Sequence, residues 1–134
     1  MTTNHETNLS GRWEGQFNYQ SRFRPEFFIA NLIETKGRLG GSIQEVALNG
    51  RYKGSLCYAI VTGMRDGYIV DFIKQYDGYG RRHAVKYTGY LRANGQEIEG
   101  TWKIRPNWSG KFLMIRSSSL SPSTNQQEVE MLLV

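Results

Sequence analysis

Hydrophobic and polar residues alternate along most of the chain, from residue 11 to residue 116. A period of two places successive side chains on opposite faces of a strand, whereas a helix repeats about every 3.6 residues. Glycine-containing breaks interrupt the alternation at short intervals, which is typical of an all-β sandwich or barrel. The pattern therefore predicts an all-β body without helices.

Eight strands are expected from this alternation. They cover approximately residues 11–19, 26–35, 38–46, 50–63, 67–76, 85–91, 98–104 and 110–116. Asp66-Gly67 and Asn94-Gly95 read as tight turns, because this kind of pair accepts the positive φ of a two-residue hairpin. Gly54 falls inside the fourth predicted strand, where we expect a bend or bulge.

The short connections favour one particular fold. Consecutive strands joined by short loops form an antiparallel meander, and eight such strands close most simply into an up-and-down barrel without free edges. A barrel of about eight strands is either filled by its own side chains or holds one small ligand. The expected fold is therefore an eight-stranded antiparallel up-and-down β-barrel.

The 134 residues suit one domain, which we place at residues 10–116. We expect a flexible head at residues 1–9, and a polar tail at 117–134 that ends in a short apolar segment. That segment could dock on the barrel or a partner subunit, or serve as a recognition or degradation signal. Neither a membrane-spanning run nor a leader is evident, so a cytoplasmic location is expected.

Residues with metal or redox chemistry are few. Cys57 is the single cysteine and reads as a small buried hydrophobe, while His5 and His83 have no partner at ligand spacing. No metal site and no cofactor are therefore expected. The net charge of +5 permits attraction to anions or nucleic acid without showing it.

Topology predicts where a binding site would lie. In a meander every second loop emerges at the same end, so the loops near residues 20–25, 47–50, 77–83 and 105–109 gather in one mouth. Guanidinium groups bind carboxylate or phosphate, and aromatic rings beside them provide apolar surface. The candidate ligand-binding residues in and below this mouth are Tyr19, Lys74, Tyr76, Arg81, Arg82, Tyr87, Trp102, Arg105 and Trp108.

Two basic residues fall on the inward face of the predicted strands. Lys74 would lie among aromatic side chains, where an unpaired ammonium is costly, so we expect it to reach the mouth, pair with an acid or meet a ligand anion. Arg116 ends the last strand at the opposite end and is expected to close that end against an aromatic face.

A family resemblance appears in several short motifs. These are Gly11-Arg12-Trp13 near the start, the segment 68–76, Tyr87-Thr88-Gly89-Tyr90 and Gly100-Thr101-Trp102. Together they resemble the avidin and streptavidin family of calycin barrels, to which the lipocalins are related. The resemblance implies a ligand-binding barrel, with Phe72, Trp102 and Trp108 near the positions of the family's tryptophans.

The segment after Trp13 departs from that family. Avidins follow their first tryptophan with Asn and then a Gly-Ser pair that help to grip biotin, whereas this chain has Glu14-Gly15-Gln16-Phe17-Asn18. Biotin is therefore not the expected ligand.

Several strands are apolar on both faces, which predicts contact with other protein surface. The residues expected to face outward are Phe27, Ile29, Ile33, Cys57, Ala59, Val61, Ile69, Ile73, Leu113 and Ile115. A solitary barrel would expose them to water, so we expect a homodimer or a larger homo-oligomer, as the avidin-like pattern also suggests.

The expected function is non-enzymatic binding of a small apolar or aromatic molecule that carries an anionic group. A second possibility is an interaction module for single-stranded nucleic acid or an acidic protein. A third is an isomerase or cyclase that uses Tyr and Lys, since no nucleophile or phosphate motif is present and Glu14 and Asp71 fall in the outward register.

Overall fold

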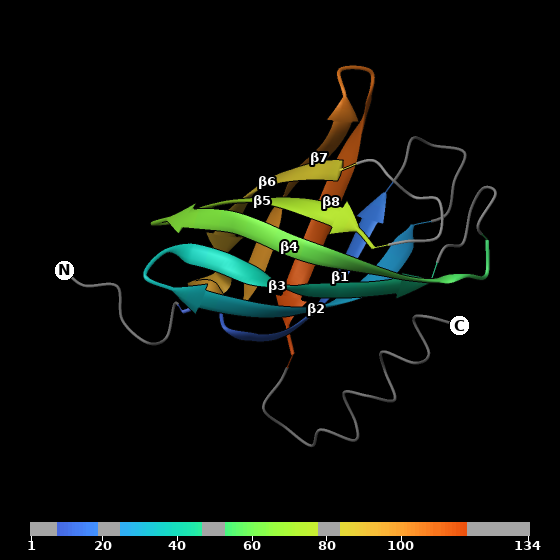
Figure 1. Ribbon diagram of the computed structural model, residues 1–134. Coiled ribbons are helices and arrows are strands. Elements are labelled where there is room, and N and C mark those ends of the chain that lie inside the picture. The colour runs from blue at the N-terminus through green and yellow to red at the C-terminus, as the bar shows by residue number, and fades with distance from the viewer. Residues whose placement is uncertain (1–7, 19–24, 47–52, 78–83, 118–134) are drawn as a thin grey trace.

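The computed structural model is a closed barrel of eight antiparallel strands, each hydrogen-bonded to its neighbours in sequence order (Figure 1). The structure describes residues 8–18, 25–46, 53–77 and 84–117. The strands are β1 (Gly11–Asn18), β2 (Glu26–Thr35), β3 (Arg38–Val46), β4 (Leu56–Asp66), β5 (Ile69–Tyr76), β6 (Ala84–Arg92), β7 (Glu97–Arg105) and β8 (Trp108–Arg116). Because β1 pairs with both β2 and β8, the sheet has no free edge, and the predicted up-and-down barrel is confirmed.

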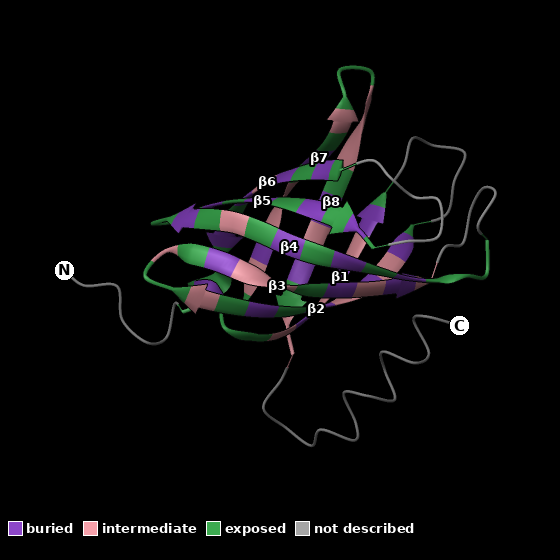
Figure 2. Cartoon of the chain, viewed as in Figure 1, coloured by how far each residue is buried: buried purple, intermediate pink, exposed green. Residues whose placement is uncertain are grey.

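The alternation of the sequence becomes an alternation of burial. In β5, for example, Val70, Phe72, Lys74 and Tyr76 are buried, while the residues between them are exposed. Figure 2 shows the same change of colour from one residue to the next along the strands. The inward residues of all eight strands form a single apolar core, which contains Cys57 as expected.

Glycine is required at two kinds of place. The ring of Phe28 lies directly over Gly15, where an added Cβ would be 2.1 Å from the ring, so Gly15 makes room for an inward aromatic residue. In the turn η2 (Ala93–Gly95), Asn94 and Gly95 have φ of 57° and 85°. The positive φ predicted for this pair is thus confirmed.

The fourth strand differs most from the prediction. Gly54, with φ of 87°, lies in the turn before β4 and not in a strand, so β4 runs from Leu56 to Asp66. The two-residue period does not continue through such a turn. The predicted register turned Cys57, Ala59 and Val61 outward, but all three are buried, and Leu56, Tyr58, Ile60 and Met64 are exposed instead. For Cys57, burial agrees with its separate interpretation as a small buried hydrophobe.

Two boundaries also differ. Tyr68 falls within the predicted fifth strand, residues 67–76, but it lies in the turn after β4 and is exposed. Trp108 was expected in a loop, but it is the first residue of β8, whose hairpin with β7 stands at the top of Figure 1. On β2, β5 and β8, Ile33, Ile69, Ile73 and Ile115 do face outward as predicted.

The end of the barrel at which β2, β4, β6 and β8 finish is closed by side chains. The guanidinium carbon of Arg116 lies 4.5 Å from the centre of the Trp13 ring, and Nη2 of Arg116 donates to the carbonyl oxygens of Asn8 (2.7 Å) and Gly95 (3.1 Å). Nε1 of Trp13 donates to the carbonyl oxygen of Leu9, whose side chain is buried. The structural role predicted for Arg116 at this closed end is confirmed.

A buried ion pair supports the same end. Nη1 of Arg65 lies 3.0 Å from Oε1 of Glu34, and that oxygen also accepts a hydrogen bond from the backbone N–H of Leu9. Nε of Arg65 donates to the carbonyl oxygen of Gly67 in the neighbouring turn. These contacts connect the turns of the closed end to the segment before β1.

The predicted head and tail lie largely outside the described residues. Within the described part of the chain, no helix has the length and apolar character needed to cross a membrane.

Candidate functional site

The opposite end, called the mouth end here, is where β1, β3, β5 and β7 finish. Five inward residues with polar groups lie close to it: Glu26, Glu45, Lys74, Tyr76 and Tyr87. Because inward residues recur every second position, the start of β2, the end of β3, the end of β5 and the start of β6 supply them to one level of the barrel. This set is called the polar floor.

An ion pair forms the centre of the polar floor. Nζ of Lys74 lies 3.1 Å from Oε2 of Glu45, and the two side chains are 1% and 0% exposed. The hydroxyl of Tyr76 donates to the other carboxylate oxygen of Glu45. Burial of an ammonium or a carboxylate is costly unless the charge is paired and hydrogen-bonded, and here both conditions are met. The pairing predicted for Lys74 is confirmed.

Aromatic rings surround the ammonium. Nζ of Lys74 lies 4.6 Å from the ring centres of both Phe17 and Tyr76, and 5.3 Å from that of Tyr87. A cation at these distances from ring faces is attracted by the ring quadrupoles, more strongly where water is excluded. The rings and Glu45 together stabilise a charge that water does not reach.

This environment shifts the pKa values of Lys74, Tyr76 and Tyr87. Burial is the largest single effect and lowers the pKa of Lys74, but Glu45, Tyr87 and Tyr76 together outweigh it and hold that pKa well above the ordinary 10.5. Burial also raises the pKa of Tyr76 and of Tyr87 above the ordinary 10.0, against the opposing effect of the Lys74 ammonium. All three groups therefore stay protonated near neutral pH.

Apolar packing fills the space beside and beneath the floor. The rings of Phe72 and Tyr87 stack with their centres 4.7 Å apart, and Phe112 meets Tyr87 edge-on at 4.8 Å. Trp102 meets Phe17 edge-on, and its Nε1 donates to the carbonyl oxygen of Asn18 at 3.1 Å. Tyr87 and Trp102, predicted as walls of a pocket, are thus packed into the core, where they are 1% and 2% exposed.

The structure brings together Lys74, Tyr76, Tyr87 and Trp102 of the predicted site residues. Arg105 and Trp108 lie apart from the floor, at the tip of the β7–β8 hairpin, where the guanidinium carbon of Arg105 is 5.2 Å from the Trp108 ring centre. Arg105 is exposed and Trp108 half-buried. Tyr19, Arg81 and Arg82 lie outside the described residues.

The two acids of the floor, Glu26 and Glu45, were missed by the sequence analysis. Glu26 precedes Phe28 by two positions and Glu45 follows Ile43 by two, so the period of each strand places both acids inward. The two-residue period, extended to the ends of both strands, predicts that Glu26 and Glu45 point inward. The inward position of Lys74 also indicates that an acidic partner is needed. The outward placement expected for Glu14 and Asp71 is consistent with their half-buried and exposed positions.

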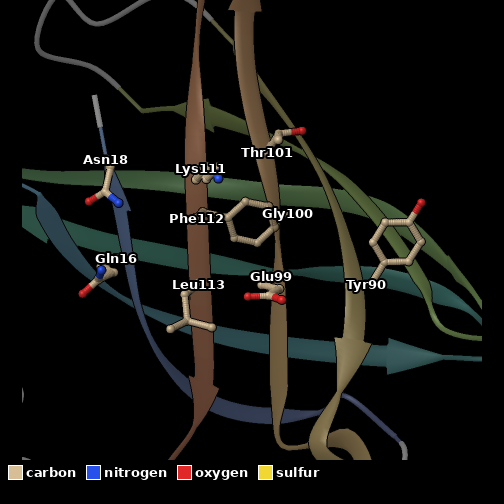
Figure 3. Close-up of a pocket in the computed structure, with 9 residues that line it drawn as sticks. All are labelled: Gln16, Asn18, Tyr90, Glu99, Gly100, Thr101, Lys111, Phe112 and Leu113. Carbon is tan, nitrogen blue, oxygen red and sulfur yellow. The ribbon is translucent and has the colours of Figure 1, made fainter. Parts of the chain in front are cut away.

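A concave surface lies on the outside of the barrel. It is a groove of about 400 Å³ over β1, β6, β7 and β8, shown in Figure 3. Its lining residues are Gln16, Asn18, Tyr90, Glu99, Gly100, Thr101, Lys111, Phe112 and Leu113. The groove carries one acid and one base and includes none of the predicted site residues, so it is distinct from the mouth end.

No group of three or more His, Cys, Asp and Glu side chains within the described residues is arranged to hold a metal ion. Neither a family model nor a curated protein sequence matches this chain. What the protein shares with the calycin barrels is therefore its architecture, a closed antiparallel barrel of eight strands.

Proposed function

We propose that this protein binds one small molecule at the mouth end of its barrel, above the polar floor, without catalysing a reaction. The proposal rests on the buried Lys74–Glu45 ion pair, in which Glu45 also accepts a hydrogen bond from the hydroxyl of Tyr76. It is a polar cluster of fixed geometry, buried at one end of an otherwise apolar core.

The floor is difficult to explain by stability alone. Replacing a buried ion pair by apolar residues of similar volume is often neutral or stabilising, so such a pair is weak evidence for a stabilising role. Perturbed ionisable groups in a concave site are instead frequent where ligands bind. The aromatic rings around Lys74 give the polar floor an apolar component.

The ligand that suits these groups is apolar or aromatic and carries an anionic group. Glu45 already neutralises the ammonium of Lys74, so the floor offers polarity without an excess of positive charge. An anion would find a better partner in the exposed guanidinium of Arg105, beside the ring of Trp108. We therefore place the apolar part of the ligand toward the floor and its anionic group toward the hairpin tip. Biotin is not proposed.

The pKa directions disfavour the isomerase alternative. A general base must be unprotonated at the working pH, and the raised pKa of Lys74 and of Tyr76 keeps both protonated near neutrality. A binding role requires no such proton transfer.

A fluorescent probe with the proposed chemistry tests the idea. 1-Anilinonaphthalene-8-sulfonate joins aromatic rings to an anion, and we expect its fluorescence to rise and saturate at one probe per barrel. Arg105→Gln should weaken binding by about 5- to 10-fold, corresponding to roughly 1 to 1.4 kcal/mol.

The matched control is Arg92→Gln, the same change in an exposed arginine at the end of β6. It should leave probe binding unchanged, with circular dichroism confirming that both variants fold. No saturable signal, or equal affinity in both variants, would refute the proposal. Displacement of the probe by single-stranded DNA, with an affinity that falls as salt rises, would favour the interaction-module alternative instead.

A further inference from the structure

The outer face of β4 is unusually apolar. Leu56, Tyr58, Ile60 and Met64 all point outward, and Ile60 and Met64 are 52% and 65% exposed. These four residues are called the β4 stripe. β4 crosses the front of the barrel in Figure 1 with β3 and β5 on either side, so the stripe runs along the centre of one convex face. Thr62 is the one polar residue between them on this face, and an exposed stripe that is otherwise apolar indicates a protein contact.

The residues that flank the stripe differ between its two sides. Met64 has Arg38 beside it on β3 and Asp71 beside it on β5, and all three are exposed. Neither Arg38 nor Asp71 forms an ion pair with another of the described residues. The two charges lie about two strand spacings apart, roughly 9 to 10 Å, on opposite sides of β4.

In the next outward row the two sides differ in side-chain size. Thr62 has Gly40 beside it on β3 and the exposed Ile73 beside it on β5. One side of the row therefore lacks a side chain and the other presents a large one. In the row after that, Ile60 lies between Ser42 and Gln75.

We propose that this face binds a second copy of the chain, around a two-fold axis parallel to β4. Such an axis places β4 over the partner's β4 and β3 over the partner's β5. Arg38 then meets the partner's Asp71, and Ile73 lies over the partner's Gly40, each contact occurring twice. A two-fold interface must be complementary to itself, and these rows meet that condition in both charge and size.

Gly40 supplies a second, independent indication. Its φ is not positive, and an added Cβ would have no atom nearer than the carbonyl oxygen of Val61 at 4.0 Å. The fold of the monomer therefore does not require glycine at this outward position. A glycine in a strand is unfavourable for the isolated chain, so space for a neighbouring molecule accounts for it.

The oligomeric state of the full-length chain tests the proposal. We expect sedimentation at micromolar concentrations to give a dimer, and Ile60→Lys to give a monomer. The matched control is Ile115→Lys on β8, across the barrel, because Ile115 is 47% exposed. It should remain a dimer. A monomeric wild type, as expected if the C-terminal segment covers the stripe instead, would overturn the proposal, as would a dimeric Ile60→Lys variant.

Charge exchange tests the direction of the axis. Arg38→Glu or Asp71→Arg alone should raise the dimer dissociation constant at least 10-fold, and the double variant should restore much of the loss. Gly40→Leu should also weaken the dimer while leaving the melting temperature of the dilute monomer equal or higher. A double variant that is no better than either single variant would overturn the proposed arrangement.

Discussion

The two ends of the barrel each hold a cation against aromatic side chains, but they satisfy its charge in different ways. At the closed end, Arg116 lies over Trp13 and donates mainly to backbone carbonyl oxygens, including those of Gly95, Asn8 and Ser10. At the mouth end, Lys74 is paired with the side chain of Glu45. One cation joins segments of backbone, and the other belongs to a cluster made of side chains alone.

This difference indicates different roles. Backbone carbonyls near a strand end are fixed by the fold, so a guanidinium that bridges several of them acts as a structural fastener. The Lys74–Glu45 pair connects β5 to β3 over the inner face of β4, although those strands are already joined through β4. The closed end is therefore interpreted as structural, and the mouth end as the proposed binding surface.

The largest expected effect comes from breaking the pair at the mouth end. Lys74→Met leaves Glu45 buried without its cation, which should lower the free energy of unfolding by about 3–5 kcal/mol. Lys74→Met combined with Glu45→Gln removes both charges and keeps an acceptor for Tyr76, so it should recover most of that loss. Urea denaturation measures both. Equal stability of the single and double variants would contradict the account.

A smaller loss is expected from the closed end. Arg116→Met removes charge-assisted hydrogen bonds to three carbonyl groups from a partly exposed site, and should lower the free energy of unfolding by about 2–3 kcal/mol. Binding of anilinonaphthalene sulfonate by the folded variant should be unchanged. Weakened probe binding in this variant would remove the distinction between the two ends.

Alkaline pH should destabilise the protein through the mouth end. Tyr76 and Lys74 keep their protons in the folded state above pH 10, where the unfolded chain loses them. The folded state then binds more protons, so stability falls as pH rises, by at most about 1.4 kcal/mol per pH unit for each group. Tyr76→Phe should flatten the fall in unfolding free energy measured from pH 9 to pH 11. An unchanged slope would contradict the assigned direction.

The smallest effect on stability is expected at the hairpin tip. Trp108→Ala should change the free energy of unfolding by less than about 1 kcal/mol, because Trp108 is only half-buried. It should nevertheless weaken the probe several-fold, since the indole lies beside Arg105. A variant that loses stability but keeps full affinity would assign Trp108 to the core and not to the site.

The sequence predicted the barrel and three of the five residues of the polar floor, namely Lys74, Tyr76 and Tyr87. In β5 the alternation continues without a break, so it placed Lys74 and Tyr76 inside correctly. In β4 the predicted inward and outward faces were wrong, because the two-residue period does not continue through Gly54, which lies in a turn with positive φ. A shift of one residue there exchanged the buried and exposed faces of the whole strand.

The identity of the partner of Lys74 is a property of the closed barrel. Glu45 is 29 positions away in sequence, and it reaches Lys74 because β3 and β5 both pair with β4, so that their inward side chains meet over the inner face of that strand. The local sequence pattern can indicate that a buried lysine needs an acidic partner, but it cannot identify which acidic residue of the chain is that partner. The same holds for Arg38, Met64 and Asp71, whose common row depends on strand register.

The indole N–H groups provide the most direct test of the central claim, that ligands bind at the mouth end alone. The chain has three tryptophans: Trp13 at the closed end, Trp102 beside the floor and Trp108 at the hairpin tip. In a ¹H–¹⁵N spectrum titrated with anilinonaphthalene sulfonate, the indole signals of Trp102 and Trp108 should shift and saturate together while that of Trp13 stays in place. A shift of Trp13 alone, or of no indole signal, would contradict the account.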